Sequence, residues 1–237
     1  MPRDGAFVMV MGANGFAMEV MAAAGIFYKD FGPADGAFVV EDDSPMIGEK
    51  AMGFPVIAES DVKRTSQGRQ VDCYVAIGQP SIRRRVVGVM EEALGDAVEF
   101  PALIPPGTSI MGQLAIGRGV AIMPGCVLTV GVQLHEFSFI NAGCCLMHGV
   151  KVGAYSGINP RSILSGEVTI GEDVYVGSAV TVLPGVSVCD TVVIGAGAVV
   201  VDSITQPGVY VGSPSRRIKD HPASHIVTVP GKIVRPN

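Results

Sequence analysis

Residues 146–182 read LMHGVKVGAYSGINPRSILSGEVTIGEDVYVGSAVTV, and an aliphatic side chain occupies every sixth position of this stretch. The same step of six continues in both directions, from Ile104 to Val200, without an insertion. One apolar residue in six fits neither the period of a helix nor the alternation of a simple strand. It is typical of a short strand and a turn repeated many times. The pattern therefore predicts a parallel β-helix of the hexapeptide type.

A second column of small or β-branched residues lies two positions before the aliphatic one. Its members are Val150, Ser156, Ser162, Val168, Val174, Val180, Val186, Val192 and Ala198. Three hexads close one triangular coil, so we expect residues that are 18 apart to stack on each other. The small second column would allow the flat faces of this prism to pack closely around the aliphatic side chains.

The first hundred residues have a different pattern. Strands are expected at four apolar runs, residues 6–11, 37–40, 54–57 and 73–77. Helices are expected at 16–28 and from Ser81, as the N-cap, to Leu94. Strands that alternate with helices indicate a small Rossmann-like parallel sheet. The predicted division is an α/β domain over 1–100, a β-helix over 101–214 and a C-terminal tail over 215–237.

Composition narrows the classes of function. The chain has 237 residues, a formal net charge of −5 and five cysteines. An acidic chain does not offer the broad basic surface that nucleic acid requires. The cysteines form no CxxC pair, and we expect them to be reduced, buried thiols in a cytoplasmic protein.

The apolar start of the chain needs its own interpretation. Residues 5–28 are interrupted by Gly12, Asn14, Gly15 and Glu19, so they are too polar for a membrane span. A strand, a turn and a helix explain them better. An export signal, supported by small residues near the end of this stretch, is the weaker alternative.

The GANG turn at 12–15 lies between an expected strand and an expected helix. The free N–H groups at such a helix start can bind a phosphate or carboxylate. The dinucleotide fingerprint would need glycine at Asn14 and Ala17, so NAD is disfavoured. Asp42 and Asp43 end the next strand and could accept a hydrogen bond from a ligand. The alternative is a plain tight turn beside solvated acids.

Two histidines, His135 and His148, lie in the repeat. His148 falls two residues after an aliphatic position, where a side chain faces outward, and Gly166 occupies the same place one coil later. Imidazole has an ordinary pKa near 6.5 and suits general-base catalysis. An exposed histidine without a role is the alternative. The two histidines are 13 residues apart and do not stack, so we predict no metal site.

A basic cluster lies at the end of the repeat. Arg216, Arg217 and Lys219 follow a Gly-Ser-Pro turn. Clustered cations of this kind can hold phosphates, such as those of coenzyme A. A solvated basic turn would have the same sequence.

The hexads, the GANG turn, FVVEDD (38–43) and VYVGSPSRRIK (209–219) together resemble a family of left-handed β-helix sugar acetyltransferases. The family includes the sialic acid O-acetyltransferases and the N-acetyltransferases of nucleotide-linked amino sugars. The resemblance extends over about residues 6–220. It implies a left-handed β-helix, a homotrimer with active sites between neighbouring prisms, and acetyl-CoA as co-substrate. It also implies an N-terminal domain that binds a sugar nucleotide.

The resemblance also suggests roles for single residues. NAGCCLMHGVKVG (141–153) matches the catalytic motif of the family at Asn141 and His148, and His148 would be the general base. Gly166 matches the glycine whose N–H binds the thioester carbonyl. Residues implied to bind CoA are Gly166, Ser178, Ala179, Ala196, Gly197 and, from the basic cluster, Arg216. Residues implied to bind the sugar nucleotide are Gly12, Asn14, Gly15, Asp42 and Asp43.

The sequence departs from the family pattern at two positions. The carboxylate that directly follows the family's histidine is Gly149 here, and a second histidine nine residues on is Gly157. A base without its acid is expected to be weaker. Glu136 or Glu167 could replace the missing carboxylate.

Three functions are compatible with these observations. The first is transfer of an acetyl group from acetyl-CoA to the amine of a nucleotide-linked amino sugar, with no nucleic acid or membrane partner. The second is O-acetylation of sialic acid or another hydroxyl. The third is a homologue that binds nucleotide or CoA without turnover.

Overall fold

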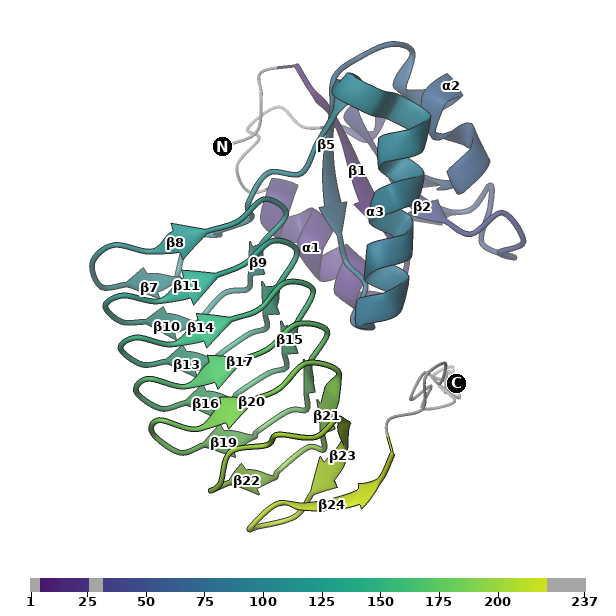
Figure 1. Ribbon diagram of the computed structural model, residues 1–237. Coiled ribbons are helices and arrows are strands. Elements are labelled where there is room, and N and C mark those ends of the chain that lie inside the picture. The colour runs from purple at the N-terminus through teal and green to yellow at the C-terminus, as the bar shows by residue number, and fades with distance from the viewer. Residues whose placement is uncertain (1–4, 26–31, 221–237) are drawn as a thin grey trace, which may run out of the picture.

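The computed structural model describes residues 5–25 and 32–220. An α/β domain sits at one end of a three-sided prism of short parallel strands (Figure 1). Among the described residues, no helix is long and apolar enough to cross a membrane. The predicted strand, turn and helix at the apolar start are present as far as Gly25, where the described part of that helix ends. The tail segment 221–237 lies outside the described residues.

The N-terminal domain is built on a sheet of six strands in the order β3-β4-β2-β1-β5-β6. Its strands are β1 Phe7–Met11, β2 Gly36–Val40, β3 Lys50–Ala51, β4 Phe54–Ala58, β5 Val71–Val75 and β6 Val98–Glu99. Its helices are α1 Gly15–Gly25, α2 Val62–Ser66 and α3 Pro80–Leu94, with short 3-10 turns at Pro33–Asp35, Glu59–Asp61 and Gly95–Ala97. All strand pairs are parallel except β3 with β4, so the sheet is mixed and not purely parallel as predicted.

Helices cover both sides of this sheet. Val8 and Val10 of β1 pack in one apolar cluster with α1 residues, while Met9 and Met11 pack in another with α3 residues. Because side chains alternate along a strand, a strand buried on both faces reads as an unbroken apolar run. This explains the sequence FVMVM of β1.

The prism consists of two-residue strands that repeat every six residues, and residues 18 apart pair in parallel, as in Val127 with Cys145. Three faces result, which we name after their first strands. The strands of the β7 face are β7 Ser109–Ile110, β10 Val127–Leu128, β13 Cys145–Leu146, β16 Ile163–Leu164, β19 Thr181–Val182 and β22 Val199–Val200. Those of the β8 face are β8 Ala115–Ile116, β11 Gln133–Leu134, β14 Lys151–Val152, β17 Thr169–Ile170 and β20 Ser187–Val188. Those of the β9 face are β9 Ala121–Ile122, β12 Phe139–Ile140, β15 Gly157–Ile158, β18 Tyr175–Val176, β21 Val192–Ile194, β23 Gly208–Val211 and β24 Arg216–Lys219.

The predicted aliphatic column is the core of the prism. From Ile122 to Val200 its side chains are buried in a single cluster, and the small second column is buried with them. The first coil is less covered, and Ile110 is 38% exposed. Ser156 and Ser162 keep their hydroxyls bonded inside the wall, to the carbonyls of Gly171 and Gly177. The sequence prediction of this core is confirmed.

The N-terminal domain packs on the β9 face. Ala121 and Phe139 of this face share an apolar cluster with α1, and the neighbouring edge contributes Phe137 and Tyr155 to the cluster of α3. Arg83 of α3 fixes this contact, because its guanidinium donates to the carbonyl oxygens of Phe137 and Tyr155 at 3.0 and 2.6 Å. Burial lowers the pKa of Arg83 to about 9, which leaves it charged at neutral pH.

Three predictions need correction. Helix α3 begins at Pro80 after Gln79, so Ser81 is not its N-cap; proline is favoured in a first helical turn, where its missing N–H costs nothing. The tail does not begin at residue 215, because β24 turns back and pairs antiparallel with β23. The cysteines are all free, as expected, but Cys145 and Cys189 are only partly buried.

Candidate functional site

His148 lies on the prism edge between the β7 and β8 faces, in the turn that joins β13 to β14, and its side chain is exposed. We call this corner the His148 edge. The imidazole packs against Gly166 of the next coil: a Cβ added to Gly166 would be 2.4 Å from Nε2 and 3.1 Å from Nδ1. The ring of His148 therefore occupies the space that a side chain at position 166 would fill. Among the described residues, the N–H of Gly166 has no hydrogen-bond acceptor, whereas its carbonyl accepts from Gly185.

The side chain of Glu167, from the next coil, approaches Gly149, the residue that follows His148. A Cβ added to Gly149 would lie 2.3 Å from Oε1 of Glu167, so the side chain of Glu167 reaches back over Gly149. The Glu167 N–H donates to the carbonyl of His148 at 2.8 Å. Glu136, the other acid considered from the sequence, instead accepts a hydrogen bond from Arg118 at 3.0 Å.

The other candidate residues of the prism lie on a different edge. Asn141, Ser178 and Ala196 follow strands of the β9 face, in the turns that lead to the β7 face. Asn141 uses its side-chain oxygen to accept from the N–H of Ala142 at 2.8 Å. The structure therefore does not bring Asn141 next to His148 in one chain. The candidate CoA residues of this edge are Ser178, Ala179, Ala196 and Gly197, all of them exposed.

The expected basic cluster is on the far end of the prism, in β24. Arg216 is exposed and donates to the carbonyl of Ser215 at 2.8 Å, and Arg217 pairs with Asp220. Gly157, where the family has a second histidine, lies under the ring of Phe139 on the β9 face.

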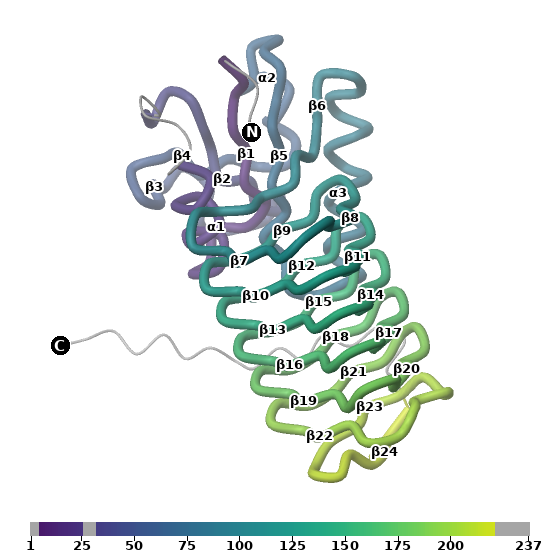
Figure 2. The backbone as a smooth tube through the Cα atoms, turned by 90° about the vertical axis from the view of Figure 1, so that its left-hand side faces the viewer, coloured from purple at the N-terminus to yellow at the C-terminus, as the bar shows by residue number. Residues whose placement is uncertain are grey.

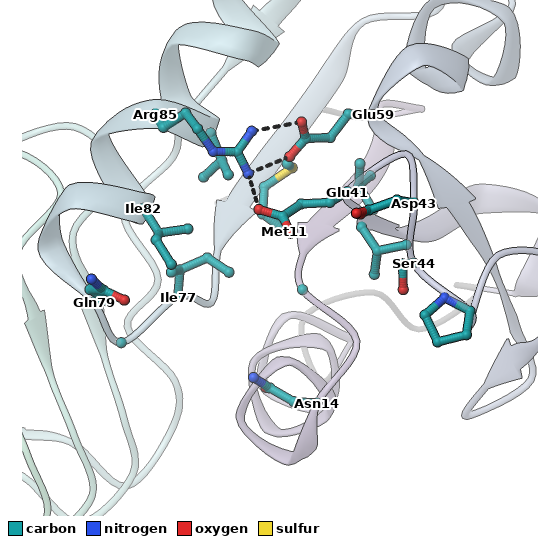
Figure 3. Close-up of a pocket in the computed structure, with 16 residues that line it drawn as sticks. Met11, Asn14, Glu41, Asp43, Ser44, Glu59, Ile77, Gln79, Ile82 and Arg85 are labelled. Atoms are coloured by element: carbon teal, nitrogen blue, oxygen red, sulfur yellow. Dashed lines mark hydrogen bonds and ion pairs between the residues drawn. The ribbon is translucent and has the colours of Figure 1, made fainter. Parts of the chain in front are cut away.

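A cavity of about 580 Å³ opens at the carboxyl ends of β1, β2 and β5 (Figure 3). Its volume is in the range of small-molecule sites. Of the predicted substrate residues, Gly12, Asn14 and Asp43 line it. Asn14 also caps α1, because its side-chain oxygen accepts from the N–H of Ala17 at 3.0 Å.

Two predicted substrate residues do not line this cavity. Gly15 is the first residue of α1, and Asp42 is turned to the amide of Ser60, from which its Oδ1 accepts at 2.9 Å. Asp42 thus holds a loop in place. The roles assigned to both residues remain predictions.

An ion-pair network in the cavity was missed from the sequence. Arg85 of α3 donates to Glu59 at 2.9 and 3.1 Å and to Glu41 at 2.7 Å (Figure 3). The hydrogen bond that Arg85 donates to Glu59 is the main reason that the pKa of Arg85 is raised. Only Glu41 carried a sequence signal, since it directly precedes Asp42 and Asp43 at the end of β2.

The described residues contain no group of three or more His, Cys, Asp or Glu side chains that could hold a metal ion.

The cavity, His148 and the predicted CoA residues lie on three different sides of the molecule. The domain that carries the cavity packs on the β9 face, and the His148 edge is the corner opposite that face (Figures 1 and 2). Ser178 and the other predicted CoA residues lie on another prism edge, where the β9 face meets the β7 face, and the β7 face separates this edge from His148. One chain alone does not gather the cavity, the histidine and the predicted CoA residues.

Comparisons with known proteins bear on this arrangement. No protein-family model matches the sequence. The acetyltransferase domain of PglB from Neisseria gonorrhoeae, solved with acetyl coenzyme A, is 28% identical, with a TM-score of 0.78 over 90% of this chain and 100% of that one. A mutant of perosamine N-acetyltransferase from Caulobacter crescentus, solved with CoA and GDP-perosamine, is 23% identical, with a TM-score of 0.81 over 91% and 98%.

WeeI from Acinetobacter baumannii has the same fold, at 24% identity and a TM-score of 0.82 over 90% of this chain and 100% of that one. These matches span both domains and not the prism alone, which many hexapeptide proteins could share. With a mixed α/β domain placed before three sheets of short parallel strands, this chain shares the two-domain fold of perosamine N-acetyltransferase and is similar over nearly its whole length to the acetyltransferase domain of PglB.

Proposed function

We propose that this protein transfers an acetyl group from acetyl-CoA to the amine of a nucleotide-linked amino sugar, with His148 as the general base. The observation that carries the proposal is the exposed imidazole of His148, seated on Gly166 at a prism edge. The similar solved enzymes support the substrates, because one was solved with acetyl coenzyme A and another with CoA and GDP-perosamine.

His148 would take a proton from the sugar amine while the nitrogen attacks the thioester carbonyl. The C–S bond then breaks, and the departing sulfur of CoA receives a proton. Nε2 is the nitrogen closest to Gly166 and is the atom we assign to this proton transfer. General-base help of this kind contributes about 10²–10⁴ to the rate.

The N–H of Gly166 would stabilise the negative charge that develops on the thioester oxygen. The imidazole packs on Gly166, and the N–H of this residue has no acceptor among the described residues. One such donor is worth about 3 kcal/mol in the transition state.

The cavity in the N-terminal domain is the proposed site for the nucleotide. It lies where the strands of an open α/β sheet end, which is the usual ligand position in such folds. The N-terminus of α1 faces it and favours a phosphate group. Arg85 adds a cation that can exchange a carboxylate partner for a phosphate oxygen.

A homotrimer would bring the separate parts of the site together. The β7 face, whose strands Figure 2 shows stacked along the prism, lies between His148 and the predicted CoA residues. Some of its apolar side chains are left uncovered by one chain. Those at least 38% exposed on this face or its His148 edge are Ile110, Met111, Val130, Met147, Ile163 and Leu183. A second prism packed here would bury these side chains and place its own residues beside His148.

The test is a panel of nucleotide-linked amino sugars with acetyl-CoA, in which release of free thiol is measured for the wild type and for His148→Asn. We expect the variant to lose about 10²–10⁴ of kcat and to keep its assembly and melting temperature. His135→Asn, an exposed histidine of the same repeat, is the matched control. An unchanged rate for His148→Asn would reject the base.

The alternatives predict other results on the same panel. An O-acetyltransferase would release thiol with sialic acid or another hydroxyl acceptor and not with amines. A binding protein without turnover would retain nucleotide or CoA in calorimetry and release no thiol with any acceptor.

A further inference from the structure

We infer that Arg161 of one copy forms an ion pair with Glu167 of the next copy, and that this pair sets the register between neighbouring prisms. The inference rests on the homotrimer of the proposed function, which packs the prisms along their β7 faces. Arg161 lies between the β9 and β7 faces, in the turn that joins β15 to β16, and we call this corner the Arg161 edge. Glu167 lies on the His148 edge, at the other border of the same face.

The guanidinium of Arg161 has no partner within the described part of its own chain. Every other arginine that the structure describes makes a side-chain hydrogen bond or an ion pair. The side chain of Arg161 is exposed and is the only charged one in the turns of its edge. These turns are 105–107, 123–125, 141–143, 159–161, 177–179 and 195–197. The cation is therefore available to an acid from outside the chain.

The backbone of Arg161 is left-handed, with a φ of 61°. The equivalent positions on neighbouring coils also have positive φ, and they are Gly125, Gly143, Ala179 and Gly197. This conformation is easy for glycine and costly for a residue with a long side chain. Such a cost is typical of a residue that has a function, and a single chain gives this arginine none.

Glu167 has matching features on the His148 edge. Its backbone is left-handed with a φ of 60°, and its side chain is exposed. No hydrogen bond or ion pair engages its carboxylate among the described residues, whereas Glu136 is bound to Arg118. The two edges that border the β7 face therefore carry one free cation and one free acid.

Both side chains lean by one coil toward the start of the prism. The Cγ of Arg161 lies 3.6 Å from the position of a Cβ added to Gly143, and the carboxylate of Glu167 reaches the place of a Cβ added to Gly149. Residues 161 and 167 are one third of an 18-residue coil apart, and successive coils are separated by about 4.8 Å. The two charges therefore end at nearly the same height along the prism.

A ring of three parallel prisms brings the two edges together. Each contact in such a ring joins two different patches, one from each copy. When the β7 faces turn to the axis of the ring, the Arg161 edge of one copy meets the His148 edge of the next at equal height. The pair then forms at all three contacts, and it places Ser178 and the other predicted CoA residues opposite His148 of the neighbouring copy.

The test reverses each charge in turn and follows the assembly by sedimentation equilibrium. Arg161→Glu and Glu167→Arg each place like charges at all three contacts. Each should raise the concentration at which half of the assembly dissociates by about 10-fold or more. The double variant Arg161→Glu with Glu167→Arg restores opposite charges at every contact and should assemble as the wild type does. Lys151→Glu, an exposed reversal in the same coil on the β8 face, is the matched control and should also assemble normally.

This measurement separates the ion pair from the proposed acetyl transfer, because it needs neither acetyl-CoA nor an acceptor. Single variants that assemble as the wild type does would overturn the inference. A double variant that stays dissociated would overturn it too, and so would a wild type that sediments as a monomer. Full thiol release by His148→Asn would instead reject the proposed base and leave the ion pair in place.

Discussion

Gly166 has its role because it has no side chain. The ring of His148 rests where a Cβ would stand, and the backbone of Gly166 does not need a positive φ. The requirement is therefore one of space and not of backbone conformation. A methyl group here would push the imidazole outward without straining the turn.

This gives a prediction at the scale of one residue. Gly166→Ala should lower kcat by about 10-fold or more, because a 1 Å displacement of a catalytic group is costly, while melting temperature changes little. Gly88→Ala in α3 is the control, since an added Cβ there meets nothing within 4 Å. Full activity in Gly166→Ala would show that the ring is not held where catalysis needs it.

At the residue scale, sequence reasoning identified His148 and its outward position but not its neighbours. The hexad period predicts which side chains face inward, because one aliphatic position in six must fill the core. It does not tell how an outward side chain leans across coils. Glu167 could be named as one of two acids, and only the contact over Gly149 separates it from Glu136.

At the scale of elements, the three consecutive arginines of α3, Arg83, Arg84 and Arg85, each bind different partners. Arg83 is buried and bonds to carbonyls of the prism, Arg84 pairs with Asp173 at 2.9 Å, and Arg85 enters the cavity. Successive residues of a helix point about 100° apart, so three adjacent cations reach three places. In the sequence they look like one exposed basic patch, and for this reason their burial and pairing could not be predicted.

The contact between the domains depends on the first of these arginines. Arg83→Met should lower the free energy of unfolding by about 2–4 kcal/mol, since it leaves the carbonyls of Phe137 and Tyr155 without their donor. For a chain of this size we expect a fall in Tm of about 5–15 °C. Arg64→Met, on an exposed side chain in α2, is the control. Equal melting of the two variants would contradict the role of Arg83.

At the scale of the whole molecule, the three faces of the prism differ in how much of their surface is covered and in how apolar it is. The first coils of the β9 face are covered by the N-terminal domain of the same chain, and the β8 face is polar, with exposed Gln133, Lys151 and Ser187. Apart from Ile218 of β24, the exposed large apolar side chains of the described part of the prism lie on the β7 face or its His148 edge, among them Ile163 at 43% exposed. The sequence predicted the triangular coil but not which face stays uncovered, because that depends on where the domain packs.

Assembly through this face can be tested directly. Ile163→Lys should convert the proposed trimer to monomers in sedimentation equilibrium, because it would put a charge into the apolar contact that we propose between copies. Activity should fall with it, since one chain does not gather the whole site. Ser187→Lys on the β8 face should leave the assembly intact. A trimer that survives Ile163→Lys would place the interface elsewhere.

A crystal structure of the protein with CoA bound would test the central claim most directly. The account predicts that the sulfur of CoA lies beside Nε2 of His148, over Gly166, in a crevice between two copies of the chain. A CoA sulfur bound away from this imidazole, or enclosed by a single copy, would contradict it.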